Sequence, residues 1–234
     1  MIFRMRRALV GLFVLLAAGA ATAQPHLAPG FTKLPPNSVI ALMPADVELF
    51  EISAGGVNEP RAEWTAAAAR HIMADLRARK EKLGARATEI TGEQDETVEA
   101  LNSLHGAVSR AILVHHFGQL QLPTKDGKLD WTLGPDVAKL REKSGADYAL
   151  FTWVRDSYAS AERKAMMAVG IALAFAGMGG VALQGGSQQA YASLVDLRTG
   201  QIVWFNRMVR GSGDLREPEA AKESLDLLLT GFPL

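Results

Sequence analysis

Histidines and acids are the residues with the most capacity for chemistry, because the 234-residue sequence contains no cysteine. Thiol catalysis and thiolate metal sites are therefore excluded. His71 and Asp75 stand four residues apart and offer two ligands on one helical turn, whereas a catalytic zinc takes three protein ligands. His105 and His116 would lie about three turns apart on one helix, too far to share an ion. We therefore predict no metal site and no cofactor.

The motifs of common hydrolases and nucleotide-binding proteins are missing from the sequence. No Gly-x-Ser-x-Gly elbow occurs, and the run at 211–213 lacks that spacing. Gly177-x-Gly179 lacks the third glycine of the dinucleotide fingerprint, and no P-loop Gly-Lys-Ser/Thr is present. We therefore predict that the chain is not an enzyme, and an unrecognised hydrolase is the third-ranked function.

One set of glycine and polar residues is a candidate ligand or partner surface. Gly55 and Gly56 follow the first pair of predicted strands, whereas Asp156, Ser157 and Tyr158 follow the predicted central strand. Ligand crevices in open α/β sheets lie beyond the carboxyl ends of parallel strands. If these strands are parallel, the two loops meet at one edge of the sheet. Ordinary loop chemistry is the alternative, since the hypothesis rests on fold-level analogy.

The elements that would position these residues form an α/β pattern. Apolar or alternating runs predict strands at 38–43, 46–52, 85–90 and 147–154, then a hairpin over 189–209 with Gly200 in its turn. Helical spacing predicts helices from Glu59-Pro60 to Gly84 and over 95–117, 135–143 and 217–230. We predict an α/β fold with a mixed sheet of about five strands, packed helices, and a carboxy-terminal β-hairpin followed by a helix.

The amino terminus has the features of a secretory signal peptide. Three arginines precede an uncharged stretch at 8–21, and Ala21 and Ala23 occupy the small-residue positions that a signal peptidase reads. The apolar stretch is shorter than the ~20 residues of a spanning helix. We predict a signal peptide over 1–23 that is cleaved after Ala23, export to the periplasm, and an extended lead-in at 24–37 before a single domain at 38–234. Without cysteine, the chain cannot be a lipoprotein anchored at a lipobox.

The charge balance disfavours nucleic acid as a partner. The chain has 25 basic and 25 acidic residues, and removing the signal's three arginines leaves 22 against 25 in the mature protein. Nucleic-acid binding needs a concentrated basic surface. Hydrophobic residues make up 48% of the chain, near the globular norm, so apolar burial has to supply the stability that disulfides give many exported proteins.

An uncharged Ala/Gly-rich stretch, 165–183, lies within a predicted insertion at 163–188. It is long enough to span a bilayer, although Arg163 and Lys164 would then lie against the positive-inside tendency. Three interpretations stay open: packing against the sheet, which is favoured, association with a partner or another copy, and membrane insertion. The candidate residues for an apolar association or membrane segment are Met166, Met167, Val169, Ile171, Leu173, Phe175, Met178, Val181 and Leu183.

Two segments resemble bacterial envelope proteins. Residues 144–151 read Ser-Gly-Ala-Asp-Tyr-Ala-Leu-Phe, and residues 195–204 read Val-Asp-Leu-Arg-Thr-Gly-Gln-Ile-Val-Trp. Together with 39–43, they resemble proteins related to the curli secretion channel protein, the TolB amino-terminal domain and the penicillin-binding-protein activator lipoproteins. The resemblance implies an α/β domain used for assembly or binding in the envelope, without catalysis. The lipid-bearing cysteine common in those proteins is missing, and 156–188 has no counterpart in them.

These observations predict a non-enzymatic periplasmic or cell-envelope protein that acts in assembly or binds a protein partner, which includes another copy of itself. The alternative is a periplasmic carrier of a small molecule or lipid, with the apolar insertion as a pocket wall. A carrier requires an enclosed apolar cavity, and a hydrolase requires a cleft with converging polar groups and a perturbed titratable residue. An interaction protein should form an oligomer or co-purify with a partner.

Overall fold

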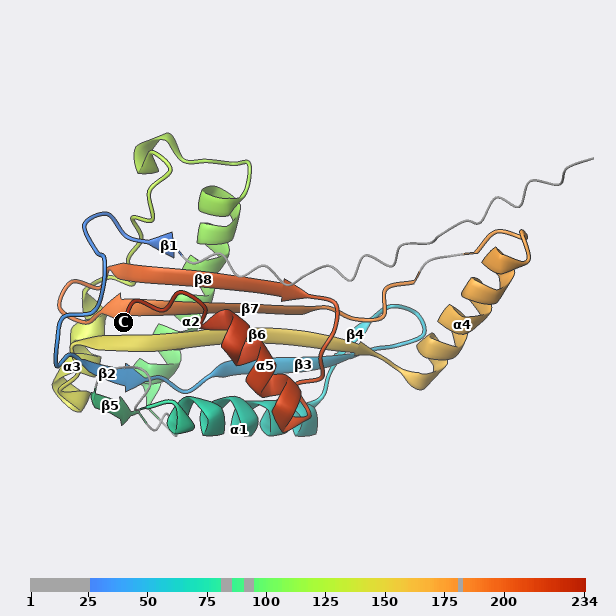
Figure 1. The fold of residues 1–234 in the computed structure, drawn as a ribbon, viewed down its shortest axis with the longest axis horizontal. Coiled ribbons are helices and arrows are strands. Elements are labelled where there is room, and N and C mark those ends of the chain that lie inside the picture. The colour runs from blue at the N-terminus through green and yellow to red at the C-terminus, as the bar shows by residue number, and fades with distance from the viewer. Residues whose placement is uncertain (1–25, 81–85, 91–94, 181–182) are drawn as a thin grey trace, which may run out of the picture.

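The computed structural model shows an open mixed sheet with helices on both faces (Figure 1). It describes residues 26–80, 86–90, 95–180 and 183–234. The predicted signal peptide, with Ala21 and Ala23, therefore lies outside the described residues, as does Val181.

Within the described ranges, the sheet has eight strands. Strands β2, β3 and β5 run parallel to β6, whereas β6, β7 and β8 form an antiparallel series. The predicted mixed sheet is confirmed, but about five strands were expected, because β1 and β4 have only two and three residues and carry no periodic signal. The strands are β1 (His26–Leu27), β2 (Val39–Leu42), β3 (Asp46–Ile52), β4 (Asn58–Pro60), β5 (Arg86–Glu89), β6 (Tyr148–Ala159), β7 (Gln188–Asp196) and β8 (Ile202–Arg210).

The helices largely follow the predicted ranges. They are α1 (Ala62–Ala78), α2 (Glu96–Ile112), α3 (Ala138–Ser144), α4 (Ala161–Phe175) and α5 (Pro218–Leu228). A π-helical turn, η1 (Leu113–Phe117), extends α2, and the 3-10 turns η2 (Pro123–Lys125) and η3 (Pro135–Val137) lie between η1 and α3. The prediction that the first helix ends at Gly84 is wrong. α1 ends at Ala78, and the Arg79 side chain pairs with Asp75 and with Asp226 of α5.

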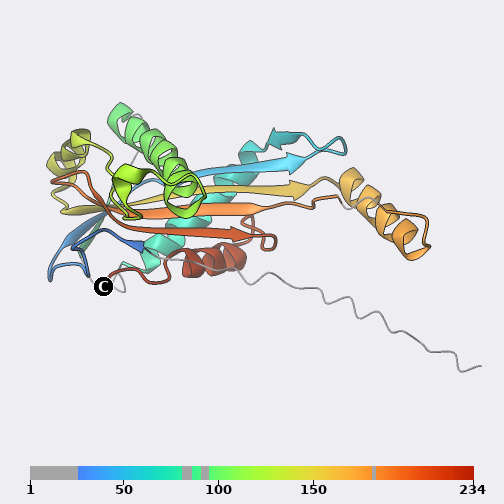
Figure 2. The same cartoon turned by 90° about the horizontal axis from the view of Figure 1, so that it is seen from above.

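Two apolar clusters hold the helices on opposite faces of the sheet. On one face, α1 and α5 pack against β6, β7 and β8 around the fully buried Trp204. On the other face, α2 and α3 pack around Phe151 and Phe205, both also fully buried. Burial of large side chains of this kind stabilises the fold by about 1.5–3 kcal/mol each. Figure 2 shows the sheet between these helical layers.

The β7–β8 turn requires glycine at Gly200 for two reasons. Its φ is +78°, a left-handed conformation that residues with a Cβ rarely adopt. A Cβ at this position would also lie 2.2 Å from the carbonyl oxygen of Gly134, which is closer than any real contact. The turn thus packs against the segment that leads into α3, and this contact joins the hairpin to the second cluster.

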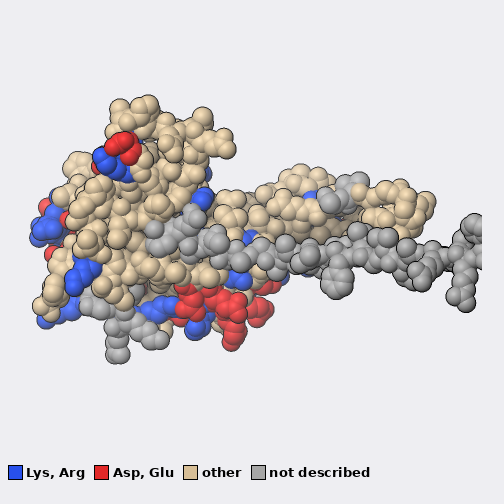
Figure 3. Space-filling model, turned by 45° about the horizontal axis from the view of Figure 1, so that its top comes forward, with Lys and Arg blue, Asp and Glu red and all other residues tan. Residues whose placement is uncertain are grey.

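The described residues of the Ala/Gly-rich insertion form an arm, defined here as residues 161–180 and 183–187. Its helix, α4, projects away from the sheet at the end opposite α3 and the carboxyl terminus (Figures 1 and 2). In the space-filling view the outer half of the arm carries no charged side chain (Figure 3). Phe175 is 86% exposed and Met178 is 74% exposed. The favoured interpretation, packing of this stretch on the sheet, is therefore wrong. No helix in the described part of the chain is both long and apolar enough to cross a membrane.

Candidate functional site

The predicted meeting of two loops is only half right. Strands β3 and β6 are parallel, with Ile52 opposite Ala159, as the hypothesis required. However, β6 extends to Ala159, so Asp156, Ser157 and Tyr158 lie inside the strand rather than in a loop after it. Their interpretation as loop residues is wrong, because the backbone pairing of β6 with β3 continues to that point.

The two glycines lie apart from these polar residues. Gly55 and Gly56 occupy the β3–β4 turn, where Gly56 has a φ of +85°. A Cβ on Gly56 would lie 3.4 Å from the guanidinium of Arg163, at the root of the arm. The five predicted residues therefore do not form one site, and the chemistry concentrates around Asp156.

The carboxylate of Asp156 is the centre of a buried hydrogen-bond network. Asp156 is only 3% exposed. The Ser157 backbone N–H donates to Oδ1 at 2.8 Å, while the Tyr158 hydroxyl and the Gln188 amide donate to Oδ2 at 2.5 and 2.7 Å. Tyr158 in turn accepts a hydrogen bond from the backbone N–H of Leu215 at 2.7 Å. Three donors thus hold a carboxylate that has no cationic partner among its contacts.

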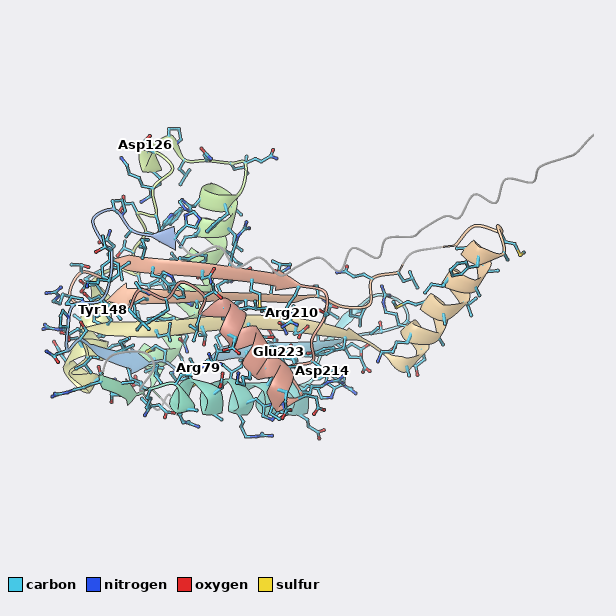
Figure 4. The ribbon with its side chains drawn as sticks, viewed as in Figure 1. Arg79, Asp126, Tyr148, Arg210, Asp214 and Glu223 are labelled. Carbon is cyan, nitrogen blue, oxygen red and sulfur yellow. The ribbon has the colours of Figure 1, made fainter. Side chains whose placement is uncertain are left out.

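The network continues into α5. Ser224 donates to the Gln188 side-chain oxygen at 2.8 Å, and Arg210 donates to Ser224 at 3.2 Å. In Figure 4, Arg210, Asp214 and Glu223 lie together around the amino-terminal half of α5. The polar groups of β6, β7, β8 and α5 are therefore connected across one face of the sheet.

Sequence reasoning missed Gln188 and Ser224. Gln188 alternates with Ala190 and Ala192 along β7 and lies on the same face, which is otherwise apolar. The sequence did contain one signal: Gln188 is a polar residue at a position of β7 that faces the core. Buried polar side chains require hydrogen-bond partners. The partner of Gln188 depends on where α5 packs, and the hydrophobic periodicity of the sequence does not predict the position of α5.

A small polar chamber lies beside Asp156. Its volume is about 60 Å³, which corresponds to about four water positions. Its walls come from the three β6 residues, from 185–188 and from the glycine-rich turn at 211–213. Gly186, with a φ of +148°, allows the close approach of these walls, since a Cβ there would lie 2.0 Å from the Ser157 carbonyl oxygen.

Burial governs the protonation of the network. Loss of solvent raises the pKa of Asp156 to about 6, against the opposing effect of its hydrogen bonds from Tyr158, Gln188 and Ser157. Burial and the adjoining Asp156 carboxylate also raise the pKa of Tyr158, which keeps its hydroxyl protonated. The chamber therefore contains one titratable carboxyl group that changes charge close to neutral pH.

We expect Tyr158→Phe to destabilise the protein by about 1–3 kcal/mol, because it removes a hydrogen bond from a buried carboxylate and leaves the Leu215 N–H without its acceptor. Urea unfolding followed by tryptophan fluorescence measures this change. Tyr191→Phe is the matched control, since the Tyr191 hydroxyl makes only a 3.4 Å contact with Gln189. Equal losses in the two variants would show that the Asp156 network contributes no specific stability.

The root of the arm is tied firmly to the strand ends beside this network. Ser160 caps α4 by accepting the N–H of Arg163, whose Nε donates to the Gln184 carbonyl at 2.9 Å. Ala159 donates to the Gly185 carbonyl at 2.9 Å. The outgoing and returning segments of the arm are therefore hydrogen-bonded to each other and to β6 at the base of the arm.

The helix of the arm has three apolar sides. One side packs against the returning chain, where a Cβ on Gly180 would lie 2.3 Å from the Gly170 carbonyl oxygen and 2.8 Å from the Ala174 Cβ. Beside it is an open groove of about 480 Å³. The groove is lined by Ala165, Met166, Val169, Gly170, Leu173, Gly179 and Leu183.

The third side is a ridge formed by Ile171 and Phe175. At about 100° per residue, this ridge lies on the side of α4 opposite Met166, Val169 and Leu173 of the groove. Ile171 is 57% exposed and Phe175 is 86% exposed. A helix that is apolar on all sides is normally buried on all sides. The arm therefore presents a convex and a concave apolar surface that the rest of the described chain does not cover.

The histidines occupy structural positions. His105 is fully buried between Ser193 and Ser109, at 2.8 and 3.1 Å from their hydroxyls, and burial lowers its pKa to about 3. His26 and His116 contact each other at 3.2 Å, and burial lowers the pKa of both. Within the described ranges, no three His, Asp or Glu side chains gather closely enough to hold a metal ion.

Comparison with known proteins returned a distant likeness to solved structures. No protein-family model and no curated protein matches the chain. A PelC dodecamer from Paraburkholderia phytofirmans is 12% identical, with a TM-score of 0.39, over 91% of this chain and 99% of that one. A dodecamer of a PelC variant from the same organism is 13% identical, with a TM-score of 0.39, over 90% of this chain and 96% of that one. At these scores the likeness carries no conclusion about what this chain binds or does.

Proposed function

We propose that this chain is a non-enzymatic protein of the bacterial cell envelope that acts in assembly, and that it associates with other copies of itself through the arm. The observation that carries the proposal is the exposure of two apolar surfaces on opposite sides of α4. Contiguous exposed apolar surface on a soluble domain marks a contact site. The envelope location rests on the signal-peptide features and on the resemblance of the 144–151 and 195–204 segments.

The shapes of the two surfaces favour a second copy as the occupant. The ridge ends in Phe175, and the groove of about 480 Å³ has small residues, Gly170 and Gly179, in its wall. A ridge and a groove on opposite sides of one element allow the ridge of one copy to enter the groove of the next. Such a head-to-tail contact uses different surfaces on the two copies, so it links more than two chains in series.

The carrier alternative is less well supported. A carrier must enclose most of its ligand's surface, whereas the arm groove is open to solvent. The apolar cavity between α5 and the sheet has a volume of about 10 Å³, which is the size of one water position. The chamber beside Asp156 is polar and too small for a hydrolase substrate, although it holds a titratable carboxyl.

The proposal is tested by Phe175→Asp in protein that begins at Gln24, using size-exclusion chromatography with light scattering. We expect the unaltered protein to run above the mass of one chain. The variant should run as a single chain, because a carboxylate at the contact loses about 1.5–3 kcal/mol of apolar burial and adds a charge-burial penalty. This weakens association by at least about 100-fold.

Leu120→Asp is the matched control, because Leu120 is 68% exposed and lies in the loop between η1 and η2, outside the arm. It should assemble like the unaltered protein. A single-chain mass for the unaltered protein at every concentration would contradict self-association, and its partition into lipid vesicles would then favour the membrane interpretation. The envelope location is tested separately by the amino-terminal sequence of the protein in periplasmic extract, which should start at Gln24.

A further inference from the structure

The carboxylate of Asp156 is buried without a compensating positive charge. Three donors surround it, all neutral: a backbone N–H, the Tyr158 hydroxyl and the Gln188 amide. The nearest basic group of the network, Arg210, is separated from it by Ser224 and Gln188. Buried carboxylates are normally paired with a cation, and an unpaired one is costly. The three hydrogen bonds stabilise the ionised carboxylate, but no cation among its contacts balances its charge.

The remaining acceptor capacity of Asp156 is on Oδ1. A carboxylate has about four lone-pair positions, and Oδ2 accepts from both Tyr158 and Gln188 while Oδ1 accepts only from Ser157. Asp156 is also one of the residues that line the chamber of about 60 Å³. An occupant that donates a hydrogen bond and carries one positive charge would complete both the hydrogen bonding and the charge balance.

We propose that this chamber binds a primary ammonium group, with Asp156 as its counter-ion. The volume matches an ammonium head with at most a short carbon stem, since it corresponds to about four water positions. Hard divalent cations need several anionic or carbonyl oxygens, whereas the chamber wall includes a single carboxylate, Asp156. The walls at 185–187 and 211–213 consist of glycine and serine, so they place no second charged side chain beside Asp156.

The site is distinct from the contact surfaces of the arm, and it does not depend on self-association. Its walls belong to β6, to residues 185–187 at the end of the returning segment, to the start of β7 and to the turn after β8. The ridge lies on α4, and the groove is formed by α4 together with Gly179 and Leu183. Gly185 and Gly186 connect the two, because they are also the end of the returning chain. Occupancy of the chamber would therefore reinforce the base of the arm without contacting its exposed helix.

The test is thermal unfolding of the unaltered protein at pH 8 with ammonium, n-butylammonium, sodium, potassium or choline chloride at equal ionic strength. We expect ammonium to raise the Tm above the choline value, by an amount that grows with concentration as mass action requires. n-Butylammonium separates the two sources of such a group: a shift equal to that of ammonium identifies an amine on an alkyl stem, and no shift identifies the free ion. Equal shifts with all cations, or a shift with sodium or potassium alone, would overturn the proposal.

Two comparisons tie the effect to Asp156. Asp156→Asn should abolish the ammonium-specific shift, and a persisting shift would contradict the assignment. The same measurement on the unaltered protein at pH 5, where the carboxyl is protonated, should also show no difference between ammonium and choline. This second comparison needs no variant, so it decides the matter if Asp156→Asn fails to fold.

Discussion

Removal of residues 165–183 is expected to abolish self-association and leave the fold of the domain intact. The deleted residues form the outer part of the arm, where Met166, Val169, Phe175 and Met178 are between 49% and 86% exposed. They add little to either apolar cluster of the domain. The ends of the deletion lie close together, since the Arg163 side chain donates to the Gln184 carbonyl at 2.9 Å. Two glycines between Lys164 and Gln184 therefore suffice to reclose the chain.

Light scattering and circular dichroism measure the two halves of this prediction. We expect a single-chain mass, an unchanged far-ultraviolet spectrum, and a loss of unfolding free energy of about 1 kcal/mol or less, as for changes away from a core. The control is a full-length variant in which the order of residues 165–183 is scrambled. It keeps the length and composition of the chain but breaks the ridge and the groove. If the shortened protein does not fold, the arm is part of the core and the proposed function loses its basis.

The strands and helices that depend on local periodicity were predictable from the sequence. The hairpin is the clearest example, because alternating residues, a left-handed Gly200 and two covered faces all agree with the register of β7 and β8. The end of α1 was not predictable, because Arg79 ends the helix where its side chain reaches Asp226 of α5. Such a contact between residues far apart in sequence carries no local signal.

The candidate sites show the same division. The apolar residues of the arm were identified from composition, but composition alone does not distinguish a buried helix from an exposed one. The position of α4 decides this, because it leaves the sheet at Ser160 instead of turning back onto it. Asp156 and Tyr158 were found as polar residues near a strand end, whereas their partners Gln188 and Leu215 come from β7 and from the loop before α5. Only the tertiary fold brings these groups together.

Between pH 6.5 and 4.5, we expect His105 to reduce the stability of the protein by about 2 kcal/mol. Its pKa is about 3 in the folded state and about 6.5 in the unfolded chain. Below pH 6.5 the histidine is therefore protonated in the unfolded state but not in the folded state. Each further pH unit lowers the unfolding free energy by up to about 1.4 kcal/mol. His105→Gln keeps a side chain able to hydrogen-bond Ser193 without a titrating ring. Over this range, the unfolding free energy of the variant relative to that of the unaltered protein should rise by about 2 kcal/mol.

Asp156 acts in the opposite direction over nearly the same range, which makes the pair a test of both assignments. Its folded pKa of about 6 exceeds the unfolded value of about 3.9, so the folded state binds the extra proton and gains stability as the pH falls through 6. Asp156→Asn removes this gain, and its stability relative to the unaltered protein should fall by about 2 kcal/mol between pH 6.5 and 4.5. Urea unfolding at half-unit pH steps measures both variants. Because the two shifts have opposite signs, a common change in the denatured state cannot produce both, and parallel curves for the three proteins would refute the burial of these groups as the cause.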